Sequence, residues 1–270
     1  MSRPWKPSPA LKASFALHAV AGAGLLAAPE AWPLALGAVV VNHGFLTAAG
    51  LLPRTAILGP NLTRLPEPAR ARREVSLTID DGPDPEVTPR VLDMLDAAGA
   101  RASFFCVGAE ARRHPALVRE IAARGHGVEN HSMRHLKRFA ALGPRAMAEE
   151  VSAAQACLGD IAGRLPAFFR PTAGLRSPFL EPILCRLDLQ LASWTRRAYD
   201  TRQGDPDRVH RILTTNLASG DILLLHDGNG APTASGQPVI LATLPRLLAT
   251  LEAAGLRSVP LHSAVDPAGP

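Results

Sequence analysis

The sequence predicts an α/β protein: a distorted (β/α)7-like barrel preceded by an apolar N-terminal helical hairpin. Three observations support this prediction. From residue 74 onward, short apolar or β-branched runs alternate with segments of helical periodicity. Polar and charged residues recur directly after those runs. Ahead of them, two long apolar stretches contain no charged side chain.

The apolar stretches cover residues 13–28 and 32–52, with the turn-like sequence PEAWP between them. A membrane-spanning helix needs about 20 predominantly apolar residues. Residues 1–70 are therefore predicted to form a membrane-associated helical hairpin and a linker, the Pro- and Arg-rich linker sequence running from 53 to 73. Two alternatives fit the same pattern: a signal sequence followed by a second apolar helix, or two buried helices of a soluble protein.

Charge and cysteine content exclude two other classes of protein. Residues 1–70 carry six basic and two acidic residues, which is most of the net charge of +5, and the remainder is nearly neutral. No nucleic-acid partner is therefore predicted. The three cysteines include no CxxC pair, so we expect neither a disulfide framework nor a cysteine zinc site.

The alternating elements begin near residue 71, so residues 71–270 are predicted to form the second domain. Strands are expected at 75–79, 102–108, 125–130, 167–171, 189–194, 221–228 and 256–261, and helices at 88–99, 115–125, 144–163, 205–220 and 244–255. This alternation is typical of a parallel sheet covered by helices. About seven such units favour a nearly closed barrel; an open doubly wound sheet is the alternative. The sequence has no Gly-rich phosphate loop.

Polar side chains follow the expected strands at the point where each strand ends. They are Asp80 and Asp81, His131 and His135, Arg170, Asp200, and His226. In β/α barrels the carboxyl ends of the strands form the rim on which active sites are built. We therefore expect these side chains to share one site.

The spacing of His131 and His135 suggests a metal site at this rim. On one turn of helix, residues four apart face the same way, and two histidines with one carboxylate form an open catalytic metal site. Of the adjacent carboxylates Asp80 and Asp81, one would bind the cation and the other would accept a proton from water. The alternatives are two surface histidines and a turn capped by an Asx residue. His226 is either a general acid or a buried core histidine.

Five motifs occur in order: TIDDGPDP, NHSMRH, FFRPTAG, SWTRRAYD and ILLLHDG. Together they resemble the polysaccharide deacetylase family, also called the NodB-homology or carbohydrate esterase family 4 group, over about residues 74–262. The resemblance implies the NodB-homology fold, a distorted β/α barrel. It also implies metal-dependent removal of N-acyl groups, usually acetyl, from sugars.

The resemblance assigns roles to the residues that match the motifs of the family. Asp80 is similar to the general base of the family and Asp81 to its metal-binding carboxylate. His131 and His135 match the two histidine ligands. Arg170 matches the arginine that holds the base.

Further matches concern the acid and the acyl pocket. His226 is similar to the histidine acid, Asp200 to the carboxylate that tunes it, and Leu224 to a wall of the acyl pocket. The backbone N–H of Ala173 is expected to contact the oxyanion. The sequence departs from the family at RPTAG, where a proline and an aromatic residue are common, and at Thr201, where tryptophan is usual.

The sequence thus predicts a deacetylase that hydrolyses an N-acetyl group on a cell-envelope glycan containing N-acetylglucosamine. The divalent metal would be Zn²⁺, with Co²⁺ or Ni²⁺ possible. A deacylase or deformylase of a lipid-linked sugar and an inactive carbohydrate-binding protein are the alternatives. We expect the bacterial inner membrane as its location. Basic residues flank both ends of the hairpin and favour a cytoplasmic domain, whereas peptidoglycan lies outside.

Overall fold

The computed structural model describes residues 3–265 of the chain. Its strands form one parallel sheet with the order β5-β4-β3-β2-β1-β7-β6, and β8 also pairs with β1. The strands are β1 (Glu74–Asp80), β2 (Ala102–Cys106), β3 (Gly127–Asn130), β4 (Phe168–Phe169), β5 (Gln190–Leu191), β6 (Arg196–Arg197), β7 (Ile222–His226) and β8 (Arg257–Ser258).

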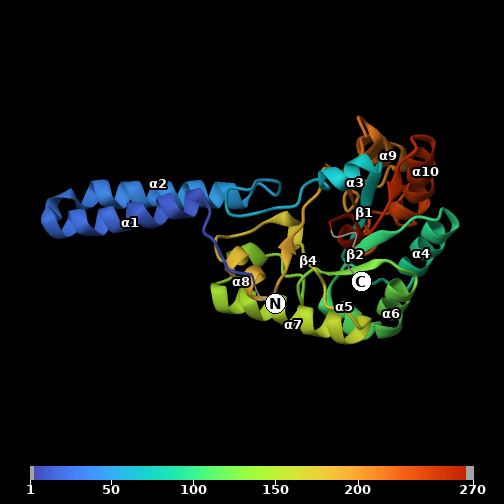
Figure 1. Cartoon of the computed structure of the whole chain (residues 1–270), viewed down its shortest axis with the longest axis horizontal. Helices are drawn as coiled ribbons and strands as arrows, with labels where there is room; N and C mark the ends of the chain where they lie inside the picture. The colour runs from blue at the N-terminus through green and yellow to red at the C-terminus, as the bar shows by residue number, and fades with distance from the viewer. Residues whose placement is uncertain (1–2, 266–270) are drawn as a thin grey trace.

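Helices cover the outer face of this sheet (Figure 1). They are α4 (Thr88–Ala97), α5 (Gly108–Arg113), α6 (Pro115–Ala123), α7 (Pro144–Ala162), α8 (Leu180–Arg186), α9 (Pro206–Thr214) and α10 (Val239–Ala253), with short 3-10 turns η2 (Phe139–Ala141) and η3 (Thr172–Gly174). The short helices α3 (Glu67–Ala71) and α11 (Leu261–Val265) instead pack with Phe105, Ile222 and Leu224, which face the interior of the barrel. The strand path does not close between β5 and β6 within residues 3–265. The predicted distorted barrel is therefore confirmed as a half-barrel, and the doubly wound alternative is wrong.

The alternation of side chains along β1 shows how the sheet positions a site. Val75, Leu77 and Ile79 belong to the apolar core that the sheet forms with its covering helices. The intervening positions Ser76 and Thr78 are polar, and both are fully buried. Because side chains alternate between the two faces of a strand, these residues point into the barrel, and Asp80 continues their row to the rim.

The two apolar helices form a hairpin that projects from the barrel (Figure 1). Helix α1 (Pro9–Ala27) packs against α2 (Trp32–Gly50), with η1 (Pro29–Ala31) between them. Both are long and apolar enough to cross a membrane. Only 11% and 17% of the most apolar 18-residue stretch of each is buried. Large apolar side chains such as Phe15, Val41 and Phe45 are more than half exposed.

The hairpin is attached to the barrel at both of its ends. Arg3, ahead of α1, forms an ion pair with Glu181 of α8 at 2.8 Å. After α2, the backbone oxygen of Gly50 accepts a hydrogen bond from the N–H of Arg176 at 3.1 Å. The chain on both sides of the hairpin therefore lies at the same end of the two helices.

The predicted linker sequence is packed against the barrel over much of its length. Leu58, Leu65 and Ala69 are almost completely buried, and Leu62 forms a parallel bridge with Ala192 beside β5. The Pro- and Arg-rich composition indicated a break in regular structure but not this packing. Apart from the short α3, the segment is irregular because its hydrogen bonds go to the barrel instead of forming a repeating ladder.

A buried histidine in the barrel predicts how stability depends on pH. Burial, together with the charge of Arg101, lowers the pKa of His126 from 6.5 to about 4, and its Nδ1 accepts the N–H of Ala102 at 3.1 Å. Between these two pKa values the unfolded state binds more protons, so stability is lost as the pH falls. From pH 7 to pH 5 we expect His126 to contribute a loss of about 2 kcal/mol in the free energy of unfolding.

Urea titration of the full chain in non-ionic detergent would check this expectation. His126→Asn retains an acceptor for the Ala102 N–H and removes the titrating group. We expect the variant to lose less stability than the wild type between the two pH values. His114→Asn, at a half-buried position, is the matched control. Equal pH dependence in the wild type and His126→Asn would contradict the prediction.

Candidate active site

The strand register brings the predicted residues to one rim of the barrel. Asp80 at the end of β1 pairs with His226 at the end of β7. The ends of β2, β3 and β4 lie at the same level, since Cys106 pairs with Asn130 and Asn130 with Phe169. His131 and Arg170 follow directly in the chain. One cavity of about 510 Å³ opens at this rim, and we call it the rim cavity. It is lined by Asp80, Asp81, His131, His135, Ala173, Leu224 and His226, among others.

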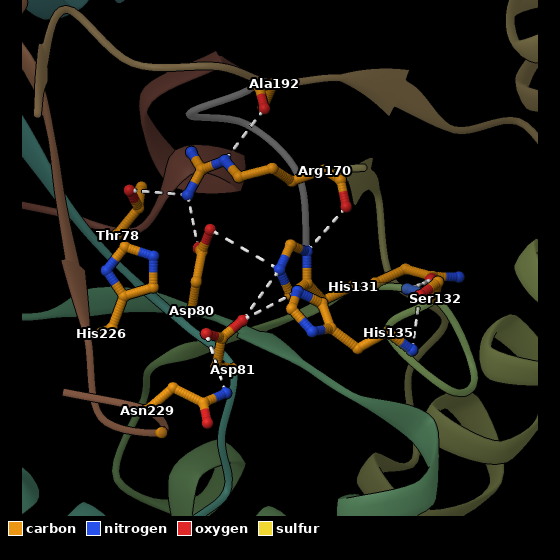
Figure 2. Close-up of polar contacts among 12 residues, drawn as sticks. Thr78, Asp80, Asp81, His131, Ser132, His135, Arg170, Ala192, His226 and Asn229 are labelled. Atoms are coloured by element: carbon orange, nitrogen blue, oxygen red, sulfur yellow. Dashed lines mark hydrogen bonds and ion pairs between the residues drawn. The ribbon is translucent and has the colours of Figure 1, made fainter. Parts of the chain in front are cut away.

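Three side chains converge as a metal site would require (Figure 2). Nε2 of His131 and Nε2 of His135 each lie 3.2 Å from Oδ1 of Asp81. One ligand atom from each residue lies within 4.8 Å of the others. Burial alone would raise the pKa of Asp81, but the hydrogen bond and charge of His131, with the charges of His226 and His135, outweigh it and hold that pKa well below its usual value.

The surrounding hydrogen bonds leave these ligand atoms available. Nδ1 of His131 is 2.7 Å from the backbone oxygen of Arg170; as a donor there it leaves Nε2 as a lone-pair atom for a cation. Oδ2 of Asp81 accepts from Asn229 at 3.3 Å. Oδ1 of Asp81 is buried, and within the described chain it faces Nε2 of His131 and of His135 and has no other donor, so it is the carboxylate oxygen that could share a cation with these imidazoles. Two imidazole nitrogens and one carboxylate oxygen are a donor set that fits a divalent cation such as zinc.

The local backbone that presents these ligands is unusual. The expected helical turn at 131–135 is wrong: the segment is an irregular loop in which Ser132 and His135 have φ values of 66° and 50°. The loop is fixed because the His135 N–H donates to Oγ of Ser132 at 3.1 Å. Asp81 also lies in the left-handed region, at φ 76°. Its backbone oxygen would be 2.6 Å from a Cβ at Gly228, so glycine is required there.

Asp80 is held by a buried arginine. Nη1 of Arg170 donates to Oδ1 of Asp80 at 2.6 Å and to Oγ1 of Thr78 at 3.0 Å, while Nε and Nη2 donate to backbone oxygens of Ala192 and Ser193. Each of the three guanidinium nitrogens thus donates at least one hydrogen bond, and the residue is 1% exposed. Oδ2 of Asp80 points toward His131, at 3.9 Å from its Nε2 (Figure 2), and is the oxygen that could accept a proton.

His226 is held in place by hydrogen bonds to Asp200. Nδ1 of His226 lies 2.8 Å from Oδ1 of Asp200, and the backbone N–H of His226 donates to Oδ2 at 2.8 Å. Burial lowers the pKa of His226, but the hydrogen bond and charge of Asp200, with the charges of Asp80 and Asp81, raise it to about 9. A protonated imidazole with Nδ1 bonded to Asp200 keeps Nε2–H as the proton it can donate.

The remaining predicted residues occupy the cavity wall. Ala173 lies in η3 at φ 57° and is exposed to the cavity, whereas Leu224 of β7 is 1% exposed at its floor. Asp200 and Arg170 do not line the cavity; they lie behind His226 and Asp80. The structure thus brings all nine predicted residues into one region.

Sequence reasoning missed several residues of this cavity. Asn229 follows the HDG motif and contacts Asp81, and its position after a strand end was the available signal. Trp194, Arg197 and Tyr199 form a stacked wall, with the guanidinium 4.9 Å from the Trp194 ring and 4.8 Å from the Tyr199 ring. The short strand β6 that carries Arg197 was not expected, because two residues give no periodicity.

The fold and the rim site define a β/α half-barrel protein with an Asp-His-His group suited to a divalent cation. The chain belongs to the polysaccharide deacetylase family, which confirms the resemblance of its motifs. The sequence profile described as "Polysaccharide deacetylase" matches residues 68–192.

Curated relatives and a solved structure agree with this membership. A chitooligosaccharide deacetylase of Azorhizobium caulinodans is 32% identical over 200 residues, which is 69% of this chain and 92% of the relative. A peptidoglycan-N-acetylglucosamine deacetylase of Bacillus cereus is 31% identical over 187 residues, or 68% of this chain and 84% of the relative. The crystal structure of the peptidoglycan N-acetylglucosamine deacetylase Bc1960 superposes with a TM-score of 0.68 at 26% identity, covering 76% of this chain and 92% of that chain.

Proposed function

We propose that this chain is a membrane-anchored, metal-dependent deacetylase that hydrolyses an N-acetyl group on a cell-envelope glycan containing N-acetylglucosamine. The observation that carries the proposal is the convergence of a complete set of reactive side chains on one rim cavity. The names of the relatives support carbohydrate deacetylation. An inactive, purely carbohydrate-binding role is disfavoured because the candidate base, acid and metal ligands are all present.

The proposed role of each side chain follows from its position in the site and from the hydrogen bonds that it already makes. Asp81, His131 and His135 would hold the metal, and a divalent cation there would supply Lewis-acid chemistry that polarises the acyl carbonyl and acidifies water. Oδ2 of Asp80 would take the proton of the attacking water, with Arg170 keeping the carboxylate in place. The backbone N–H of Ala173 would stabilise the oxyanion, and Leu224 would contact the acyl methyl group.

The second half of the reaction would use His226. As the C–O bond to water forms and the C–N bond breaks, Nε2–H of His226 would protonate the leaving amine, and Asp200 would stabilise the imidazolium. The products would be acetate and a sugar with a free amino group. The exposed Tyr199 and the Trp194–Arg197 stack offer a flat surface for a sugar ring.

We further propose that residues 1–70 form the membrane anchor with its linker and residues 71–270 the deacetylase domain at the bacterial inner membrane. The exposed apolar faces of α1 and α2 support insertion in a bilayer. Because both ends of the hairpin contact the barrel, the N-terminus and the deacetylase domain would lie on the same side of that membrane. A reporter fused to the C-terminus would identify the side.

Acetate release tests the function directly. With the full chain in non-ionic detergent and N-acetylglucosamine oligomers, we expect chelation to reduce acetate release at least 100-fold, and added Zn²⁺ to restore it. Bound metal measured on the same samples should fall and return in parallel. His131→Ala should behave like the chelated protein, whereas His114→Ala should not. Full activity in a protein stripped of metal would contradict the proposal.

A further inference from the structure

A second cavity lies where the base of the hairpin meets the barrel. We call it the hairpin groove; it has a volume of about 740 Å³ and is lined by α1, α2 and segments 137–141 and 175–179. Its walls are largely apolar, with Leu11 and Phe15 from α1, Leu46 from α2, and Leu175 and Phe179 from the barrel. Phe15 and Phe179 remain 55% and 47% exposed, so apolar surface of the groove is open on both walls.

The hairpin groove and the rim cavity are neighbours. Lys137 lines both of them. The segment that follows β4 also serves both, because residues 172–174 line the rim cavity and residues 175–179 line the groove. A molecule that occupied both cavities would therefore pass Lys137.

The junction carries positive charge for which residues 3–265 provide no ion pair. The side chains of Lys137 and Arg138 are exposed and make no ion pair or hydrogen bond within residues 3–265. A third cation, Arg176, is 4% exposed and bonds only backbone oxygens of Thr55 and Gly59. No carboxylate among residues 3–265 lines the groove. An anionic group such as phosphate fits this junction.

We propose that the hairpin groove binds the hydrocarbon chain of a lipid-linked sugar, with its phosphate at Lys137 and Arg138 and its N-acetylated sugar in the rim cavity. This inference rests on the proposed deacetylase function and names its substrate class. The proposed membrane anchor supports it, because an inserted hairpin would place the groove near the level of the lipid headgroups. A hydrocarbon chain could then pass from the bilayer along α1 and α2 into the groove.

Bulk lipid explains the same features less well. If the groove bound only ordinary membrane lipid, there would be no reason for it to adjoin the candidate catalytic cavity or to share Lys137 with it. A substrate that is part lipid, part phosphate and part sugar requires those three surfaces in that order. The groove, the Lys137 junction and the rim cavity provide them in that order.

The test compares two acetylated substrates on the full chain in detergent. The probes are N-acetylglucosamine joined through pyrophosphate to farnesol, and a water-soluble N-acetylglucosamine tetramer. We expect kcat/KM to be at least tenfold higher for the farnesyl probe. Arg138→Glu and Phe179→Glu, which lie outside the rim cavity, should each lower that value at least tenfold, mainly through KM, and leave the tetramer unaffected. Arg119→Glu and Leu165→Glu, at exposed positions elsewhere, are the matched controls.

The outcomes separate this inference from the proposed function. Similar turnover of the two probes by the wild type, or equal loss on both in the groove variants, would overturn the lipid-linked substrate and leave the deacetylase standing. If neither probe released acetate, the proposed deacetylase function would be overturned. In that case binding of the farnesyl probe, followed by tryptophan fluorescence, still decides the groove: binding weakened at least tenfold by Arg138→Glu supports it, and unchanged binding refutes it.

Discussion

Asp80→Asn is expected to lower kcat/KM for acetate release by about 10³-fold. The amide has nearly the shape of the carboxylate but cannot accept the proton that Oδ2 of Asp80 would take from water. The change does not touch the ligand atoms of Asp81, His131 or His135, so zinc should still bind with the stoichiometry of the wild type. Turnover and bound metal, measured on the same preparation, check both expectations.

Loss of the proton acceptor and loss of stability would both lower the activity of Asp80→Asn, and these two effects must be distinguished. The substitution removes the charge partner of Arg170, a guanidinium that is 1% exposed, and an unpaired buried charge destabilises the fold. Thermal unfolding therefore has to show that the variant is folded at the assay temperature. Asp93→Asn, at a carboxylate that pairs with Arg124 on the surface, is the matched control and should retain full activity. If folded Asp80→Asn kept a tenth of the wild-type activity, Asp80 would not be the base.

Much of the half-barrel could be predicted because its long elements have strong periodic signals. The β-branched run at 75–79 identified β1, and α7 (Pro144–Ala162) begins at the predicted residue. The bounds of short elements were less accurate: strands were predicted at 167–171 and 189–194, but β4 and β5 contain two residues each, because their pairing depends on neighbouring strands. Helix α10 begins at Val239 rather than 244. Pro245 suggested a helix start, but the buried residues before it extend the helix.

The candidate site was predictable from chain order but not from local conformation. Parallel strands deliver their carboxyl ends to one rim, so Asp80, Arg170 and His226 could be expected together before any contact was known. The convergence of His131 and His135 depends on two left-handed residues in a loop, which no helical spacing describes. Lys137 and Tyr199 were missed because their loops reach the cavity only through the tertiary fold.

His226→Ala is expected to reduce acetate release from an N-acetyl sugar by about 10³-fold while metal binding is retained. An amine is a poor leaving group unless it is protonated, and Nε2–H of His226 is the candidate donor. An acetate ester of p-nitrophenol needs no such proton, because its phenolate leaves readily. We therefore expect His226→Ala to hydrolyse the ester within about tenfold of the wild-type rate. Equal losses on amide and ester would contradict the acid role.

Asp200→Asn tests the same acid through its pH dependence. His226 acts in its protonated form, so the rate should fall as the pH rises through its pKa, which Asp200 helps to raise to about 9. Removing the charge of Asp200 lowers that pKa, because the imidazolium loses its nearest counter-charge. The basic limb of the kcat profile should therefore move to lower pH. Asp207→Asn, at an exposed carboxylate on α9, should leave the profile unchanged; a basic limb unmoved in Asp200→Asn would mean that another group sets it.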